Sequence, residues 1–347
     1  MAAPALTKTR VTSFDVSRGI AITFMVIGHS VVAMSHTEQG SHPFWSVFND
    51  VFHTVRMPLF FFLAGVFLIQ TLKKFGYRGW VIDKAQYLLY PWLIWSIFPG
   101  LLEVVLHQFG IGEPLTVPAV VYGVLWDPRF WYLPALFVSF AVVGGAYALS
   151  RGWKWWWAAT LGAILVLNVV TYLPWWPPIL HVHPFTVYML AGVVLHVFAK
   201  QFASIPRLYA LGVTAGAGSL FGLAVWLLWP TGQVPDMGTI PFTICAILGV
   251  ITLLAAGRSI DGFAIGRGIE RLGTWSLVIY IAHPLPMSAA RFVLEKVGVT
   301  DYSTLVLIPA VFGVGVPALL GWVTDRGHLS WLVTMPGYRR TKNTRLA

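Results

Sequence analysis

The stretch FDVSRGIAITFMVIGHSVVAMSH, residues 14–36, decides the fold class. It is mostly apolar and about 20 residues long, which is the length that a helix needs to cross a bilayer. Further apolar runs lie at 45–70, 84–107, 130–150, 154–173, 184–200, 207–229, 239–257, 273–294 and 303–324. Because backbone in lipid must satisfy its own hydrogen bonds, these runs predict helices. The predicted fold is an all-α polytopic membrane bundle of about ten transmembrane helices.

The composition agrees with this fold class. Of the 347 residues, 57% are hydrophobic and 10% are charged, whereas soluble domains carry about 25% charged residues. The first apolar run is too long for the core of a cleaved signal peptide. The single cysteine, Cys245, lies inside an apolar run, which argues against a disulfide framework and against a cysteine metal site. No metal is expected.

The lysine and arginine residues predict the orientation of the bundle. All but four lie at the two ends of the chain or in every second connection, and the exceptions are Arg56, Arg129, Arg291 and Lys296. We therefore expect a multi-pass protein of the cell (inner) membrane with both termini in the cytoplasm. Residues 1–347 would form one membrane domain, with cytoplasmic tails at about 1–13 and 325–347. The net charge of +10 then matches the anionic lipid leaflet, and no nucleic-acid partner is expected.

One face of the first run carries two ionisable residues. His29 follows Arg18 by eleven positions, which returns to nearly the same helix face about 16 Å further along the axis. Asp15 lies one turn before Arg18 and can pair with it. Arg18 is thus expected at the cytoplasmic edge and His29 near the middle of the membrane.

Other ionisable residues are expected at the depth of His29. His53 and Arg56 lie inside the second run, and His283 lies inside the ninth. Ionisable residues at membrane depth mark candidate functional sites, although a membrane histidine can also simply bond a neighbouring helix. A neutral histidine can act as a general base, and an arginine can bind phosphate or stabilise an oxyanion. These residues alone do not name a donor.

Several motifs resemble one family. Asp15-Val-Ser-Arg18-Gly19, followed by Gly28-His29-Ser30, is similar to the Arg-x10-His signature of the membrane acyltransferase family 3, which includes O-antigen, nodulation-factor and glucan O-acyltransferases. Arg56-Met-Pro-Leu-Phe-Phe-Phe-Leu-Ala-Gly65 resembles a second motif of that family. Weaker similarities follow in the family's order, at Pro91-Trp-Leu-Ile-Trp95, Phe130-Trp-Tyr-Leu133 and Tyr280-Ile-Ala-His-Pro284.

The resemblance implies transfer of an acyl group, which we expect to be acetyl, from cytoplasmic acyl-coenzyme A (acetyl-CoA) to a hydroxyl of a glycan or lipid-linked sugar. Such O-acetylation would modify a polysaccharide or a related acceptor, and no tightly bound cofactor is expected. His29 would be the catalytic base, Arg18 would bind or orient the donor, and Arg56 would stabilise developing charge. The remaining expectations are donor contacts at Lys73, Lys74 and Lys84 and substrate contacts at His53, His283, Asp15 and Trp131.

The chain departs from the family pattern at several positions. Lys84-Ala-Gln-Tyr87 replaces an arginine-rich stretch, Ala64 replaces a serine, and Arg56 stands where some relatives have histidine. A transporter or flippase for a sugar lipid or organic acid is the alternative from another class, since intramembrane arginine and histidine also suit it. An inactive acyltransferase-like partner is a third. The sequence leaves the oligomeric state open, a homodimer included.

Overall fold

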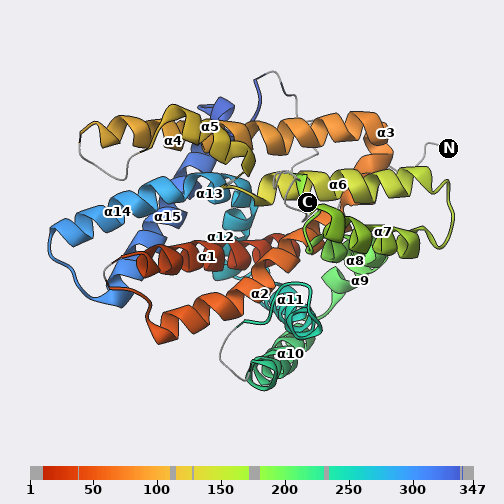
Figure 1. Ribbon diagram of the computed structural model, residues 1–347. Coiled ribbons are helices and arrows are strands. Elements are labelled where there is room, and N and C mark those ends of the chain that lie inside the picture. The colour runs from red at the N-terminus through yellow and green to blue at the C-terminus, as the bar shows by residue number, and fades with distance from the viewer. Residues whose placement is uncertain are drawn as a thin grey trace.

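The computed structural model describes residues 11–37, 39–109, 115–126, 129–171, 180–229, 234–336 and 338. All regular secondary structure in these residues is helical, which confirms the all-α prediction (Figure 1). The elements are α1 (Thr12–Ser35), α2 (Pro43–Val66), α3 (Leu68–Lys84), η1 (Ala85–Leu89), α4 (Tyr90–His107), α5 (Val117–Trp126), α6 (Tyr132–Leu149), α7 (Trp156–Thr171), α8 (Thr186–Leu195), η3 (His196–Phe198), α9 (Ala199–Ser204), α10 (Arg207–Leu228), α11 (Ile240–Ile260), α12 (Ala264–Thr274), α13 (Ser276–Ala282), α14 (Pro284–Lys296), α15 (Tyr302–Asp325) and η4 (Ser330–Leu332).

Seven helical segments in the described part of the chain are long and apolar enough to cross a membrane, which makes this a multi-pass membrane protein. A further pair, α13 and α14, passes the same test as one span bent by 51°. The seven segments are Thr12–Ser35, Leu68–His107, Tyr132–Leu149, Thr186–Ser204, Arg207–Leu228, Ile240–Ile260 and Tyr302–Asp325. Helices α2 and α7 lie on two other predicted runs without being among these seven. The count of about ten spans and the cytoplasmic side of both termini stay predictions.

The chain between the second and third predicted runs is helical. The second run was expected to end near residue 70, but α2 ends at Val66, and the basic connection forms α3. Gly76 breaks α3, because its φ of 65° and ψ of 163° are not helical. A glycine has no Cβ to oppose that conformation. The π-helical turn η1 then leads from Lys84 directly into α4.

Helix α1 is central to the bundle. It contacts α2, α11, α12, α13 and α15, and Figure 1 shows it between α2 and the α12–α13 pair. Glycines allow α12 to approach it closely: a Cβ added at Gly273 would collide with the backbone carbonyl of Asp15, and one at Gly19 with that of Ile269. Small residues at helix contacts are typical of membrane bundles. This contact places the start of α13 beside Arg18.

The beginning of the predicted C-terminal tail packs on the bundle. The indole Nε1 of Trp95 donates a hydrogen bond to the carbonyl of Leu332 at 2.8 Å, and the hydroxyl of Tyr90 donates to the carbonyl of Trp331 at 2.9 Å. The segment that follows α15 therefore lies against α4.

Candidate active site

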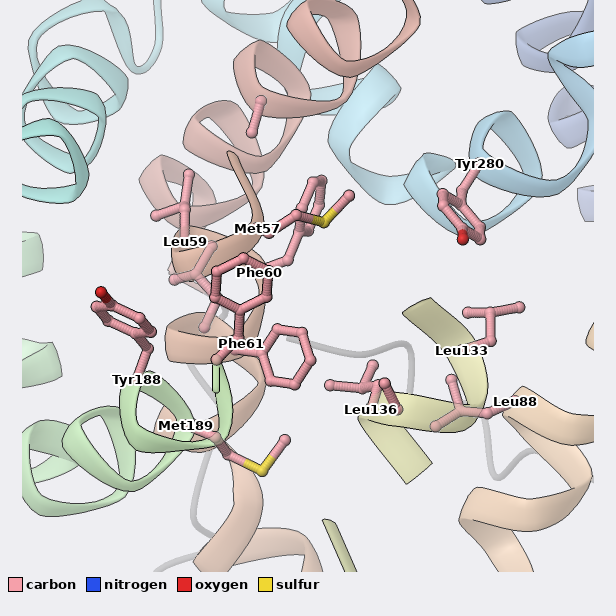
Figure 2. Packing of buried hydrophobic residues seen from close by; sticks show 14 of the residues in the cluster. Met57, Leu59, Phe60, Phe61, Leu88, Leu133, Leu136, Tyr188, Met189 and Tyr280 are labelled. Carbon is pink, nitrogen blue, oxygen red and sulfur yellow. The ribbon is translucent and has the colours of Figure 1, made fainter. Parts of the chain in front are cut away.

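A cavity of about 1120 Å³, which includes the space open to solvent at its mouth, lies beside the Arg18 end of α1; we call it the Arg18 cavity. Arg18, Lys84, Thr274 and Asp325 line it. Each lies at an end of an apolar run, and for these ends the charge pattern predicts the cytoplasmic side. The remaining wall is largely apolar. Figure 2 shows part of it: Met57 and Phe60 from α2, Leu88 from η1, Leu133 and Leu136 from α6, and Tyr280 from α13.

The two cations of the cavity are held by neighbouring carboxylates. The Nη1 atom of Arg18 lies 3.0 Å from Oδ1 of the buried Asp15, as the sequence predicted. The Nζ atom of Lys84 lies 3.3 Å from Oδ2 of Asp83, and the ring of Phe140 lies 5.6 Å away. Lys84 is only 3% exposed. Both positive charges therefore line the Arg18 cavity, and each is held by a carboxylate of its own helix.

Lys73 and Lys74 do not line the cavity. Both are exposed on α3 before its break at Gly76, and the Nζ atom of Lys74 lies over the ring of Phe75. Of the three lysines expected to contact the donor, the structure thus brings only Lys84 to the cavity, because the break redirects the helix between them.

His29 and His283 are in direct contact. Their ring centroids are 5.1 Å apart, although the residues come from α1 and from the junction of α13 with α14. Pro284 has no N–H to bond the carbonyl of Tyr280 one turn back. The Nδ1 atom of His283 lies 2.8 Å from that carbonyl. A carbonyl only accepts, so Nδ1 carries the proton, and Nε2 of the neutral ring is an acceptor.

Arg56 and His53 were also predicted at the depth of His29, and they are hydrogen-bonded to each other. Arg56 is 4% exposed, and its Nη2 atom donates to Nδ1 of His53 at 3.1 Å. Its Nη1 atom lies 3.4 Å from the carbonyl of Phe24 in α1. A Cβ at Gly28 would collide with this guanidinium. The absence of a side chain at Gly28 thus lets Arg56 reach the turn of α1 that carries His29.

The sequence reasoning missed Tyr280, which connects the cavity with the histidine pair. Tyr280 lines the Arg18 cavity, and its ring centroid is 6.4 Å from that of His283. Its hydroxyl accepts a hydrogen bond from the backbone N–H of Tyr132 at 3.3 Å. The available signal was the position of Tyr280, three residues before His283 in one motif.

Trp131 lies outside the lining of the Arg18 cavity. Its ring stacks on that of His183 with centroids 4.6 Å apart. His183 lies just before α8, and nothing in its sequence context marked it as a partner of Trp131. The structure therefore places Trp131, a predicted substrate contact, against the imidazole of His183 rather than in the Arg18 cavity.

This bundle, with buried arginine and histidine side chains beside an apolar cavity, defines a membrane-embedded class of protein rather than a soluble enzyme. The family model described as "Acyltransferase domain" (Acyl_transf_3) matches residues 11–324, so the chain belongs to that family. It is 28% identical over 144 residues to the Nodulation protein NolL of Mesorhizobium japonicum. That match covers 40% of this chain and 37% of NolL. No solved structure matches the chain.

Proposed function

We propose that the protein transfers an acyl group, most simply acetyl, from acyl-coenzyme A to a hydroxyl of a glycan or lipid-linked sugar, with His29 as the general base. The observation that carries this proposal is the Arg18 cavity. Two fixed cations line it together with an apolar wall and Tyr280, and Tyr280 packs against His283, the partner of His29.

Donor binding uses the cytoplasmic end of this arrangement. Arg18 and Lys84 attract the phosphates of the coenzyme, and charge-assisted hydrogen bonds to phosphate are among the strong ones. The apolar wall accepts the thioester arm. Helix α1 is continuous from Thr12 to Ser35, so His29 lies about 16 Å beyond Arg18 along its axis. An extended arm anchored at Arg18 therefore points its thioester toward the histidines.

The reaction proceeds in one displacement. The acceptor hydroxyl loses its proton to His29 as its oxygen bonds to the thioester carbonyl carbon. The carbon–sulfur bond then breaks, the coenzyme leaves as a thiolate, and the proton passes from His29 to that sulfur. His283 orients His29 through the acceptor character of its Nε2 atom, while Arg56 stabilises the charge that develops on the carbonyl oxygen.

The acceptor approaches from the side opposite to the coenzyme in this proposal. Trp131 lies near the start of a run that enters from that side if the spans alternate, and His53 lies deeper inside another such run. Aromatic and imidazole rings with hydrogen-bonding edges suit a sugar. In this arrangement the protein is a cell inner-membrane enzyme with cytoplasmic termini.

Transport of a sugar lipid or organic acid is a second candidate function, because the span formed by α13 and α14 is broken at His283. Interrupted helices form substrate sites in many transporters. Such proteins use paired interrupted spans, and α13–α14 is the one bent pair in the described residues. Acyl transfer therefore remains the function that we propose.

One experiment separates the two functions. Membranes that contain the protein are supplied with acetyl-CoA labelled in the acetyl group, and the label is followed into the lipid and glycan fractions. We expect label to appear in these fractions only when the protein is present, and to stay there after the acetyl-CoA is washed away. Flux of an acceptor lipid or organic acid without any dependence on acetyl-CoA would contradict acyl transfer.

A further inference from the structure

Arg291 of α14 is a buried cation that the reaction described above does not use. It is 9% exposed, and it forms no ion pair with a carboxylate in the part of the chain that the structure describes. Its Nε atom has no hydrogen-bond partner there either. Glu295, one turn further along α14, attracts Arg291 from beyond ion-pair distance. An arginine buried in a membrane bundle without a carboxylate in direct contact is costly, so such a position indicates a role.

The contacts of Arg291 lead to the residue after His29. The Nη2 atom of Arg291 donates to the carbonyl of Ser30 at 3.1 Å and lies 3.3 Å from its hydroxyl oxygen. The same hydroxyl donates to the carbonyl of Val306 in α15 at 2.8 Å. The three residues thus tie α14, α1 and α15 together at the turn of α1 that carries His29.

The bend at His283 explains why this tie matters. The axes of α13 and α14 differ by 51°, and Pro284 removes a backbone hydrogen bond at their junction. The direction of α14 therefore depends on side-chain contacts. Two consecutive residues of α1 contact the bent pair. His29 meets His283 at the bend, and Ser30 accepts a hydrogen bond from Arg291. Arg291 lies about 12 Å beyond the bend along α14.

We infer that Arg291 is a positioning residue for acyl transfer, a role that rests on the proposed function. By holding the Ser30 carbonyl, it fixes the turn of α1 that carries His29 against His283. Arg291 does not line the Arg18 cavity, so donor binding is independent of it. Its loss disturbs the alignment of the base, and a misplacement of about 1 Å can slow an enzyme about a hundredfold.

Two variants and a matched control test this inference. Arg291→Met keeps an unbranched side chain and removes every hydrogen-bond donor, whereas Arg291→Lys keeps a charged donor. Arg258→Met is the control, because Arg258 also donates to a backbone carbonyl of another segment, that of Ile205, at 2.9 Å. We expect Arg291→Met to lower kcat about 10- to 100-fold with an unchanged KM for acetyl-CoA. Arg291→Lys should give an intermediate kcat, and Arg258→Met should keep the wild-type value.

A wild-type kcat in Arg291→Met would overturn the inference, as would an equal loss of kcat in the Arg258→Met control. If Arg291→Met fails to fold, Arg291→Lys decides: a lower kcat with unchanged KM and unfolding temperature supports the role, and an unchanged kcat overturns it. A wild-type protein that transfers no acyl group would instead overturn the proposed function on which the inference rests.

Discussion

Replacing Lys84 with methionine should weaken donor binding without slowing the chemical step. Lys84 lines the Arg18 cavity and is 3% exposed, and its Nζ atom lies over the rings of Trp80 and Phe140, against which a methionine side chain can also pack. A hydrogen bond between charged groups contributes about 1.5–3 kcal/mol. Because Asp83 already lies 3.3 Å from Nζ, the phosphate gains only the lower part of this range. A loss of about 1.5 kcal/mol corresponds to a roughly tenfold higher dissociation constant.

The control for this prediction lies on the same helix. Lys73 is exposed on α3 and does not line the cavity, so Lys73→Met should leave donor binding unchanged. The assay is equilibrium binding of labelled acetyl-CoA to the purified protein, accompanied by the unfolding temperature and by kcat. Equal affinities for Lys84→Met and wild type, or an equal loss in Lys73→Met, would refute the assignment of the cavity as the donor site.

Two further predictions concern the packing of α1. Gly273→Ala should lower the free energy of unfolding by about 1–3 kcal/mol, since its Cβ collides with the carbonyl of Asp15. Gly268→Ala on the same helix, where a Cβ meets open space, should not, and thermal unfolding in detergent distinguishes them. Arg56→Lys should lower kcat about tenfold or more, because lysine cannot reproduce the fork that reaches both α1 and His53. The same change at the exposed Arg129 should have no effect, and a wild-type kcat in Arg56→Lys would contradict a role in charge stabilisation.

The helical fold was predictable because apolar length is a one-dimensional property of the chain. The contact of His29 with His283 was partly predictable too: helix geometry converts sequence position into depth, and both residues came out at one depth. Depth does not say which helices are neighbours. That information lies in close approaches such as the one between Gly273 and Asp15, which the sequence does not reveal.

Other features depend on local backbone geometry. Lys73 and Lys84 were both expected to contact the donor, but the break at Gly76 lies between them and only Lys84 reaches the cavity. Arg291 was recognised as an exception to the charge pattern, but the sequence suggested no partner for its side chain. Its partner is a backbone carbonyl, that of Ser30, and every residue carries such a group. Side-chain chemistry alone therefore had no signal for this contact.

The rate of acyl transfer by His29→Ala, measured in a single turnover with labelled acetyl-CoA and the acceptor-containing membrane fraction, tests the central claim most directly. Removal of a general base should slow the transfer about 10²- to 10⁴-fold, while donor affinity and the unfolding temperature stay at their wild-type values, because His29 does not line the Arg18 cavity. A His29→Ala protein that folds normally and transfers the acyl group at the wild-type rate would contradict the account.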